Sequence, residues 1–142
     1  MKCNEVMTRN PECCVETTTV DKVAQVMEAN DIGPVPIVSD LQSKKLIGIV
    51  TDRDLALKVV GKGKDPKTTS VKDVMNRQLV TCSPDQEINQ ALSLMEEYNV
   101  RRIPVVDSKQ QLVGIITVSD LVSRAKDPGR TRHTIERLSC SH

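Results

Sequence analysis

The strongest constraint on this 142-residue chain is that one segment occurs in it twice. Residues 6–38 align without gaps with residues 74–106, and eight of the 33 aligned positions are identical. After a turn that is two residues shorter in the second copy, residues 46–59 align with residues 112–125, with six of 14 positions identical. The identities include polar as well as apolar positions, so a shared hydrophobic pattern alone does not produce them. The sequence therefore predicts a tandem duplication of a unit of about 55 residues.

Each copy predicts the same order of elements, β-α-β-β-α. Apolar residues at positions i, i+3, i+4 and i+7 predict a helix over residues 20–30 and its repeat over residues 88–99. The residues expected on the buried faces are Val20, Val23, Ala24 and Met27 in the first copy, and Ile88, Ala91, Leu92 and Met95 in the second. Short apolar runs separated by polar turns predict the strands. The strands lie at 13–15, 35–38 and 46–50, repeated at 80–82, 103–106 and 112–116, with closing helices at 52–60 and 118–125.

The expected fold class is α/β of the mixed α+β type. The boundaries are repeat 1 at residues 1–60, a linker at 61–70, repeat 2 at 71–126 and a C-terminal tail at 127–142. A unit of this size makes a marginal core alone, so the two sheets are expected to pack face to face. Ser70 and Asp73 are expected to cap a short helix leading to Met75. The tail is expected to be partly ordered at most, with Ile135 and Leu138 free to dock on a partner.

Composition excludes several classes of function. Tyr98 is the single aromatic residue, so base-stacking platforms and aromatic cages for methylated cations are excluded. A net charge of +1, from 20 basic and 19 acidic side chains, gives no field that favours nucleic acid or a membrane surface. The longest apolar runs have five residues, against the ~20 that span a bilayer, and the first residues lack a signal-peptide core. We therefore expect a cytoplasmic protein with no nucleic-acid or membrane partner.

The chain lacks the patterns of an enzyme or a metal site. Its five cysteines contain no CxxC pair, and its two histidines, His133 and His142, both lie in the tail. A GxSxG elbow, a P-loop and a GxGxxG fingerprint are all absent. The sequence thus predicts no catalytic residue, no metal and no required cofactor. A redox or metal role for the vicinal pair Cys13 and Cys14 remains an alternative to buried, reduced thiols.

A G-x-x-T-x-x-D motif recurs where the hairpin meets the closing helix. It places Thr51 with Asp54, and Thr117 with Asp120, at the two helix starts. One interpretation is a capping box, in which threonine caps the helix and the acid lies in its first turn. The other is a binding site, in which the carboxylate accepts hydrogen bonds from both ribose hydroxyls and the helix start faces an anion. The sequence leaves both open.

A basic pair precedes the middle strand of the second copy. Arg101 and Arg102 project to opposite faces of an extended segment, so at least one can reach a phosphate, which a guanidinium binds bidentately. The alternative is a solvated strand entrance. In the first copy Gly33-Pro34 occupies this position, so we expect the first copy to bind phosphate less well than the second. Arg53 is a candidate cation that could compensate.

These paired motifs resemble the cystathionine β-synthase (CBS) domain family in tandem. They are Val-Met, Met-Glu, Val-Pro-Ile-Val with Ile-Pro-Val-Val, and Gly-Ile-x-Thr-x-x-Asp-Leu, within roughly residues 4–126. The segments 51–54 and 100–104 are similar to those of small stand-alone bacterial CBS-pair proteins, including the hypoxic-response type. The resemblance implies two repeats packed through their sheets with pseudo-twofold symmetry, commonly assembled as a homodimer. It also implies that AMP, ADP, ATP or S-adenosylmethionine binds in the clefts between the repeats.

The resemblance also assigns roles to residues. Asp54 and Asp120 would hold ribose, Thr51 and Thr117 would be their hydroxyl partners, and Arg101 and Arg102 would be the basic pair. The residues implied in adenine binding, through aliphatic side chains and backbone groups, are Cys14, Val35, Thr81, Cys82 and Ile103. The leading hypothesis is a non-catalytic sensor in which an adenosine nucleotide acts as a regulatory ligand. The alternative is a ligand-free scaffold that acts through its dimer surface or its tail on an unidentified protein target.

Overall fold

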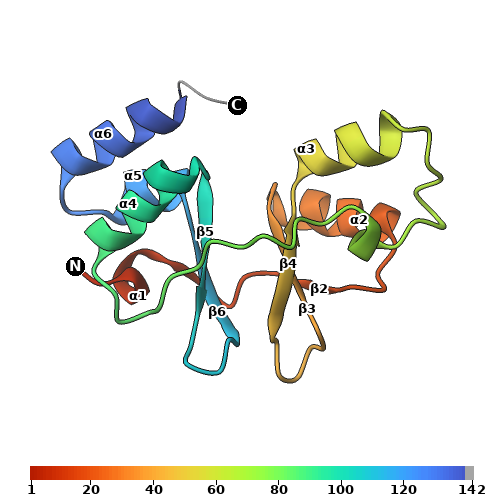
Figure 1. Ribbon diagram of the computed structural model, residues 1–142, viewed down its shortest axis with the longest axis horizontal. Coiled ribbons are helices and arrows are strands. Elements are labelled where there is room, and N and C mark those ends of the chain that lie inside the picture. Colours follow the sequence, from red (N-terminus) through yellow and green to blue (C-terminus); the bar gives the residue numbers. More distant parts are fainter. Residues whose placement is uncertain (140–142) are drawn as a thin grey trace. The chain divides into compact units, whose positions relative to one another are not determined.

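The computed structural model describes residues 1–139, which form two compact units (Figure 1). The first-repeat unit is Pro11–Leu79. The second-repeat unit joins Met1–Asn10 to the chain from Val80 onward. Each unit combines helices with a three-stranded sheet, which confirms the expected mixed α+β tandem repeat.

In the first-repeat unit the sheet has the order β2-β3-β4. β2 (Cys14–Val15) lies parallel to β3 (Val35–Val38), and β3 lies antiparallel to β4 (Leu46–Val50). Helix α2 (Val20–Asn30) connects the two parallel strands. The later helical segments are α3 (Asp52–Leu55), the π-helix η1 (Ala56–Val60) and the 3-10 helix η2 (Val71–Asp73).

In the second-repeat unit the order is β1-β6-β5. Strands β1 (Thr8–Arg9), β6 (Leu112–Thr117) and β5 (Arg102–Val106) are all antiparallel to their neighbours. The helices are α1 (Cys3–Val6), α4 (Ile88–Tyr98), α5 (Val118–Arg124) and α6 (Pro128–Ser139).

Most predicted elements are present within a residue or two of their expected bounds. The predicted strand over residues 80–82 is the exception, because it is reduced to one parallel bridge between Cys82 and Val105. That bridge corresponds to the pairing of Cys14 with Ile37 in the first-repeat unit, so the two sheets keep the same pattern. The two long helices also end alike, on residues in the left-handed conformation, Asp31 (φ 52°) and Asn99 (φ 53°).

The compact units do not follow the order of the two sequence repeats. β1 comes from the start of the first repeat but pairs with β6 of the second, with Thr8 opposite Ile115. In the first-repeat unit, Asn76 from the start of the second repeat forms the matching bridge with Ile49 of β4. Each hairpin is therefore bordered by the segment that begins the other repeat.

The tail is helical through residue 139, so the expectation of a partly ordered tail is wrong for this part. Pro128 occupies the first helical position, and Asp127 Oδ1 accepts the Arg130 N–H at 3.0 Å. Leu138, expected to be free for docking, is 1% exposed in the core of its own unit, and Ile135 is half-buried. Residues 140–142, including Cys140 and His142, lie outside the described residues.

Three smaller expectations also fail. The closing helix over residues 52–60 divides into α3 and η1, because the backbone changes to π-helical bonding at Ala56. The Ser70 side chain makes no capping hydrogen bond to η2. Ala24 is exposed, whereas Leu92, at the equivalent position of α4, is buried in a unit where α6 packs on α4.

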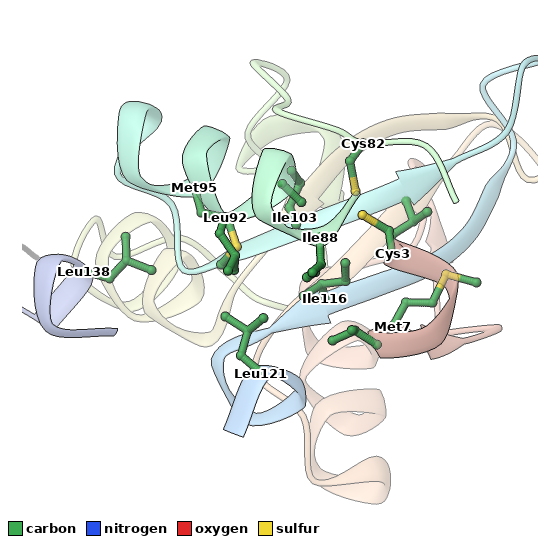
Figure 2. Close-up of a cluster of buried hydrophobic side chains, with 13 residues drawn as sticks. Cys3, Met7, Cys82, Ile88, Leu92, Met95, Ile103, Ile116, Leu121 and Leu138 are labelled. Atoms are coloured by element: carbon green, nitrogen blue, oxygen red, sulfur yellow. The ribbon is translucent and has the colours of Figure 1, made fainter. Parts of the chain in front are cut away.

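The cores are aliphatic and sulfur-containing, as the single tyrosine requires. Figure 2 shows the cluster of the second-repeat unit, in which α1, α4, α5 and α6 contribute side chains around β5 and β6. A second cluster lies between α2 and the sheet of the first-repeat unit. We call the segment that begins the other repeat the exchanged segment; it is residues 1–10 in the second-repeat unit and residues 71–79 in the first-repeat unit. Side chains from these two segments complete both clusters, since Met7 belongs to the first cluster and Met75 to the second.

Candidate functional site

In the first-repeat unit, the motif residues Thr51 and Asp54 form a complete capping box. The Thr51 N–H and hydroxyl donate to Asp54 Oδ2 at 2.9 and 3.1 Å. The Asp54 N–H donates back to Thr51 Oγ1 at 3.2 Å. The capping interpretation is therefore correct for this motif, and only the other oxygen, Oδ1, is available for further contacts.

The second-repeat unit repeats this arrangement at the start of α5. The Thr117 N–H and hydroxyl donate to Asp120 Oδ2 at 2.8 and 3.1 Å, and the Asp120 N–H reaches Thr117 Oγ1 at 3.4 Å. The same spacing thus folds into the same local structure twice. Capping does not exclude ligand binding, because an ionised carboxylate offers about four acceptor positions and the box uses two.

One turn further along, a basic side chain links each aspartate to the exchanged segment. Lys58 Nζ lies 3.3 Å from Asp54 Oδ1 and donates to the Val74 carbonyl at 3.0 Å. The Arg124 guanidinium lies 3.7 Å from Asp120 Oδ1 and donates to the carbonyls of Val6 and Met7 at 3.3 and 2.8 Å. Val6 and Val74 are equivalent in the repeat, so the aspartate, the base and the exchanged segment form the same triad in both units.

The two aspartates differ in one further contact. Thr8 Oγ1 donates to Asp120 Oδ1 at 2.8 Å. The Asp120 side chain is 9% exposed, against 22% for Asp54. The carboxylate of the first-repeat unit is therefore the more accessible of the two.

The candidate phosphate ligands lie at the surface or close to it. Arg101 is exposed just before β5, Arg102 is half-buried at its first residue, and Arg53 is exposed on α3. At Gly33, the position equivalent to Arg101, an added Cβ would lie 3.1 Å from Asp52 Oδ1. A carboxylate therefore lies beside the first-repeat position that corresponds to Arg101, in line with the expected charge difference between the copies.

The residues implied in adenine binding are mostly core residues. Val35 and Ile103 are fully buried, and Cys14 and Cys82 are 7% and 4% exposed, all within the hydrophobic clusters. Thr81 is half-buried. The four buried side chains are engaged in the cores of their own units, and Thr81 is the one residue of the five that is partly exposed.

Sequence reasoning missed Thr8, Lys58 and Arg124. The two basic residues had a signal, since they align with each other in the repeat and follow the aspartates by four residues. Thr8 had none, because it lies 112 residues from Asp120 in the chain.

With this geometry in view, comparison with known proteins decides the family. A family model described as CBS domain matches residues 3–61 and 71–127. The chain belongs to the CBS domain family. An uncharacterized protein of Methanopyrus kandleri is 37% identical over 118 residues, 83% of this chain and 57% of that protein. The chain therefore spans little more than half of that relative. Hypoxic response protein 1 of Mycobacterium tuberculosis is 35% identical over 117 residues, 82% of this chain and 80% of that protein.

Solved structures of CBS proteins share the fold. The crystal structure of hypoxic response protein I with two coordinated zinc ions is 33% identical, with a TM-score of 0.77 over 86% of this chain and 97% of that one. A CBS domain pair in complex with 5′-methylthioadenosine and S-adenosyl-L-methionine is 26% identical, with a TM-score of 0.76 over 86% of this chain and 93% of that one.

Three of the four described thiols have a raised pKa, which disfavours the reactive thiolate, whereas the hydrogen bond with Cys82 lowers the pKa of Cys3. Burial raises the pKa of Cys13, and it raises the pKa of Cys14 to about 11. Cys3 and Cys82 turn their sulfur atoms toward each other (Figure 2), and their hydrogen bond together with burial raises the pKa of Cys82. Within residues 1–139, no three His, Cys, Asp or Glu side chains converge in a way that could hold a metal ion. No helix in that range is long and apolar enough to cross a bilayer.

Proposed function

We propose that this CBS pair is a non-catalytic regulatory module that binds an adenosine-containing ligand, AMP, ADP, ATP or S-adenosylmethionine. The carboxylate at the start of each closing helix accepts hydrogen bonds from the ribose. The observation that carries this proposal is the open side of Asp54, whose Oδ1 contacts Lys58 while the capping box uses Oδ2. The complex of a related CBS pair with two adenosine compounds supports the ligand class.

Ligand-induced stabilisation tests the proposal. A ligand that binds only the folded protein raises its melting temperature, so millimolar AMP, ADP, ATP or S-adenosylmethionine should each be measured against buffer. Asp54→Asn retains one acceptor for the capping box but removes the negative charge and one acceptor oxygen, and we expect it to reduce the shift strongly. Asp52→Asn, at the neighbouring exposed carboxylate, is the matched control and should keep the shift. An unchanged melting temperature with all four compounds would contradict the proposal.

We also propose that the protein is a homodimer. Its support is the set of exposed apolar side chains on helices, with Leu57 53%, Val60 79% and Val122 69% exposed. A contiguous exposed apolar patch marks a protein–protein interface, and Leu57 and Val60 lie three residues apart on η1, within reach of forming one. Light scattering coupled to size exclusion should give twice the chain mass, and Val60→Lys should shift the particle toward the monomer. A monomeric wild-type protein at micromolar concentration would refute it.

A further inference from the structure

The two aspartates occupy equivalent positions but have different third partners. Thr8 faces Ile115 across the sheet, and its hydroxyl donates to Asp120 Oδ1 at 2.8 Å. Asn76 faces Ile49 in the equivalent pairing of the first-repeat unit. The Asn76 side chain instead accepts the Gln78 N–H at 3.0 Å, so it forms a hydrogen bond within its own loop.

The two carboxylates therefore differ in how many of their acceptor positions are occupied. Asp120 accepts two hydrogen bonds from Thr117 on Oδ2 and one from Thr8 on Oδ1, while the Arg124 guanidinium lies 3.7 Å from Oδ1 as an ion pair. Three of its four acceptor positions are therefore filled by hydrogen bonds, and Thr8 holds one of the two positions on Oδ1 that a pair of ribose hydroxyls would need. Asp54 receives the same two bonds on Oδ2 but, among the described residues, faces Lys58 alone on Oδ1.

We propose that Thr8 determines which of the two aspartates binds ribose first. Its hydroxyl holds the Asp120 acceptor position that a ribose hydroxyl needs, so an adenosine ligand binds first at Asp54. The ligand reaches Asp120 only by displacing Thr8. This inference rests on the proposed function, because it assumes that the aspartates bind ribose.

Displacing Thr8 also affects the exchanged segment. Thr8 is one of two residues of β1, and it follows Met7, whose carbonyl accepts from Arg124 and whose side chain packs on Gly114. Ligand at Asp120 therefore weakens the attachment of residues 1–10, whereas ligand at Asp54 leaves that attachment intact. Only the second binding event is coupled to the N-terminal segment.

Calorimetric titration with AMP, and separately with S-adenosylmethionine, tests this inference. We expect one tight site per wild-type chain. Asp54→Asn removes it and leaves weak binding at Asp120, and adding Thr8→Val to that variant tightens the remaining site about tenfold, because a hydrogen bond to a charged group no longer competes. Thr8→Ser, which restores the hydroxyl, should reverse the gain. Asn76→Ala is the matched control and should leave the tight site unchanged.

The outcomes separate the inference from the proposed function. Two equal sites in the wild type, or equal affinities for Asp54→Asn with and without Thr8→Val, would overturn the role of Thr8 while leaving nucleotide binding in place. Binding of neither compound by wild-type and Thr8→Val proteins would overturn both. The affinity gained through Thr8→Val should disappear with 2′,3′-dideoxy-AMP, since that compound lacks the ribose hydroxyls. A gain that persisted with it would show that Thr8 acts otherwise, and would overturn the inference.

Discussion

Met75 packs against Gly48, so closely that a β-carbon on Gly48 would lie 2.6 Å from the Met75 sulfur. Gly114 has the same relation to Met7 in the other unit. In both cases the methionine begins one repeat and the glycine lies in the hairpin of the other. The Met and Gly residues that are identical in the two repeats therefore form the same packing contact, once in each unit.

This contact predicts that Gly48→Ala destabilises the protein. The added methyl group must push Met75 out of its place, and overpacking of this kind costs about 1–3 kcal/mol of the free energy of unfolding. Urea denaturation measures the change, and the cost should shrink in a Met75→Ala background, where the space is free. Gly129→Ala in α6, where the added β-carbon would lie 3.7 Å from Asp127 Oδ1, is the control and should not destabilise. Equal costs in both Met75 backgrounds would contradict the assigned contact.

The docking of α6 predicts that Leu138→Ala is strongly destabilising. Leu138 is 1% exposed in the second-repeat core, and truncating such a leucine costs about 2–5 kcal/mol. Ile135→Ala, on the half-buried side of the same helix, should cost clearly less. The free energy of unfolding from urea titration distinguishes the two. A small effect of Leu138→Ala would mean that α6 is not part of the cooperative unit.

The contact between α4 and α6 predicts that part of the protein's stability is lost at acid pH. Burial of Glu96 acts to raise its pKa, but hydrogen bonds from Arg130 at 2.6 Å and from Thr134 at 2.8 Å outweigh burial, and the pKa is lowered. A carboxyl whose folded pKa is lowered contributes stability above its ordinary pKa, and that contribution is lost as pH falls through the folded value. We expect Glu96→Gln to cost about 1–2 kcal/mol at pH 7 and less as the pH falls to 3.

Glu28 provides the control for Glu96, because it is the identical residue of the first repeat and is exposed. Glu28→Gln should change the free energy of unfolding by less than about 0.5 kcal/mol at either pH. Unfolding titrations at the two pH values test both variants. An equal cost of Glu96→Gln at pH 7 and pH 3 would contradict the ion-pair explanation.

The buried Cys14 thiol predicts that the protein loses stability at alkaline pH. Burial raises its pKa from 9.0 to about 11, so the folded protein keeps the proton that the unfolded chain loses. The resulting stability is complete below pH 9 and is lost as pH rises through about 11, a total of about 2–3 kcal/mol. Cys14→Val cannot ionise and should lose less stability between pH 8 and 11 than the wild type. Parallel pH curves for the two proteins would refute this assignment.

Local features of this protein could be predicted from sequence because they depend on residues close together in the chain. Helix α2 and the hairpin of β3 and β4 follow from periodicity, and the Thr-x-x-Asp spacing indicated the two capping boxes as one of two interpretations. The tail helix had a local signal as well, in Asp127 followed by Pro128, but a marginal helix becomes stable only when its apolar face is buried.

The sequence by itself determined that the chain is a duplicated β-α-β-β-α unit with an aliphatic core and a paired carboxylate motif. Only the tertiary structure decided that Met1–Asn10 joins the second repeat and that Thr8 reaches Asp120. The physical reason is that pairing at the edge of a hairpin depends on which segment lies beside it. The two repeats begin with the same Val-Met pair, so periodicity cannot say which hairpin each one borders.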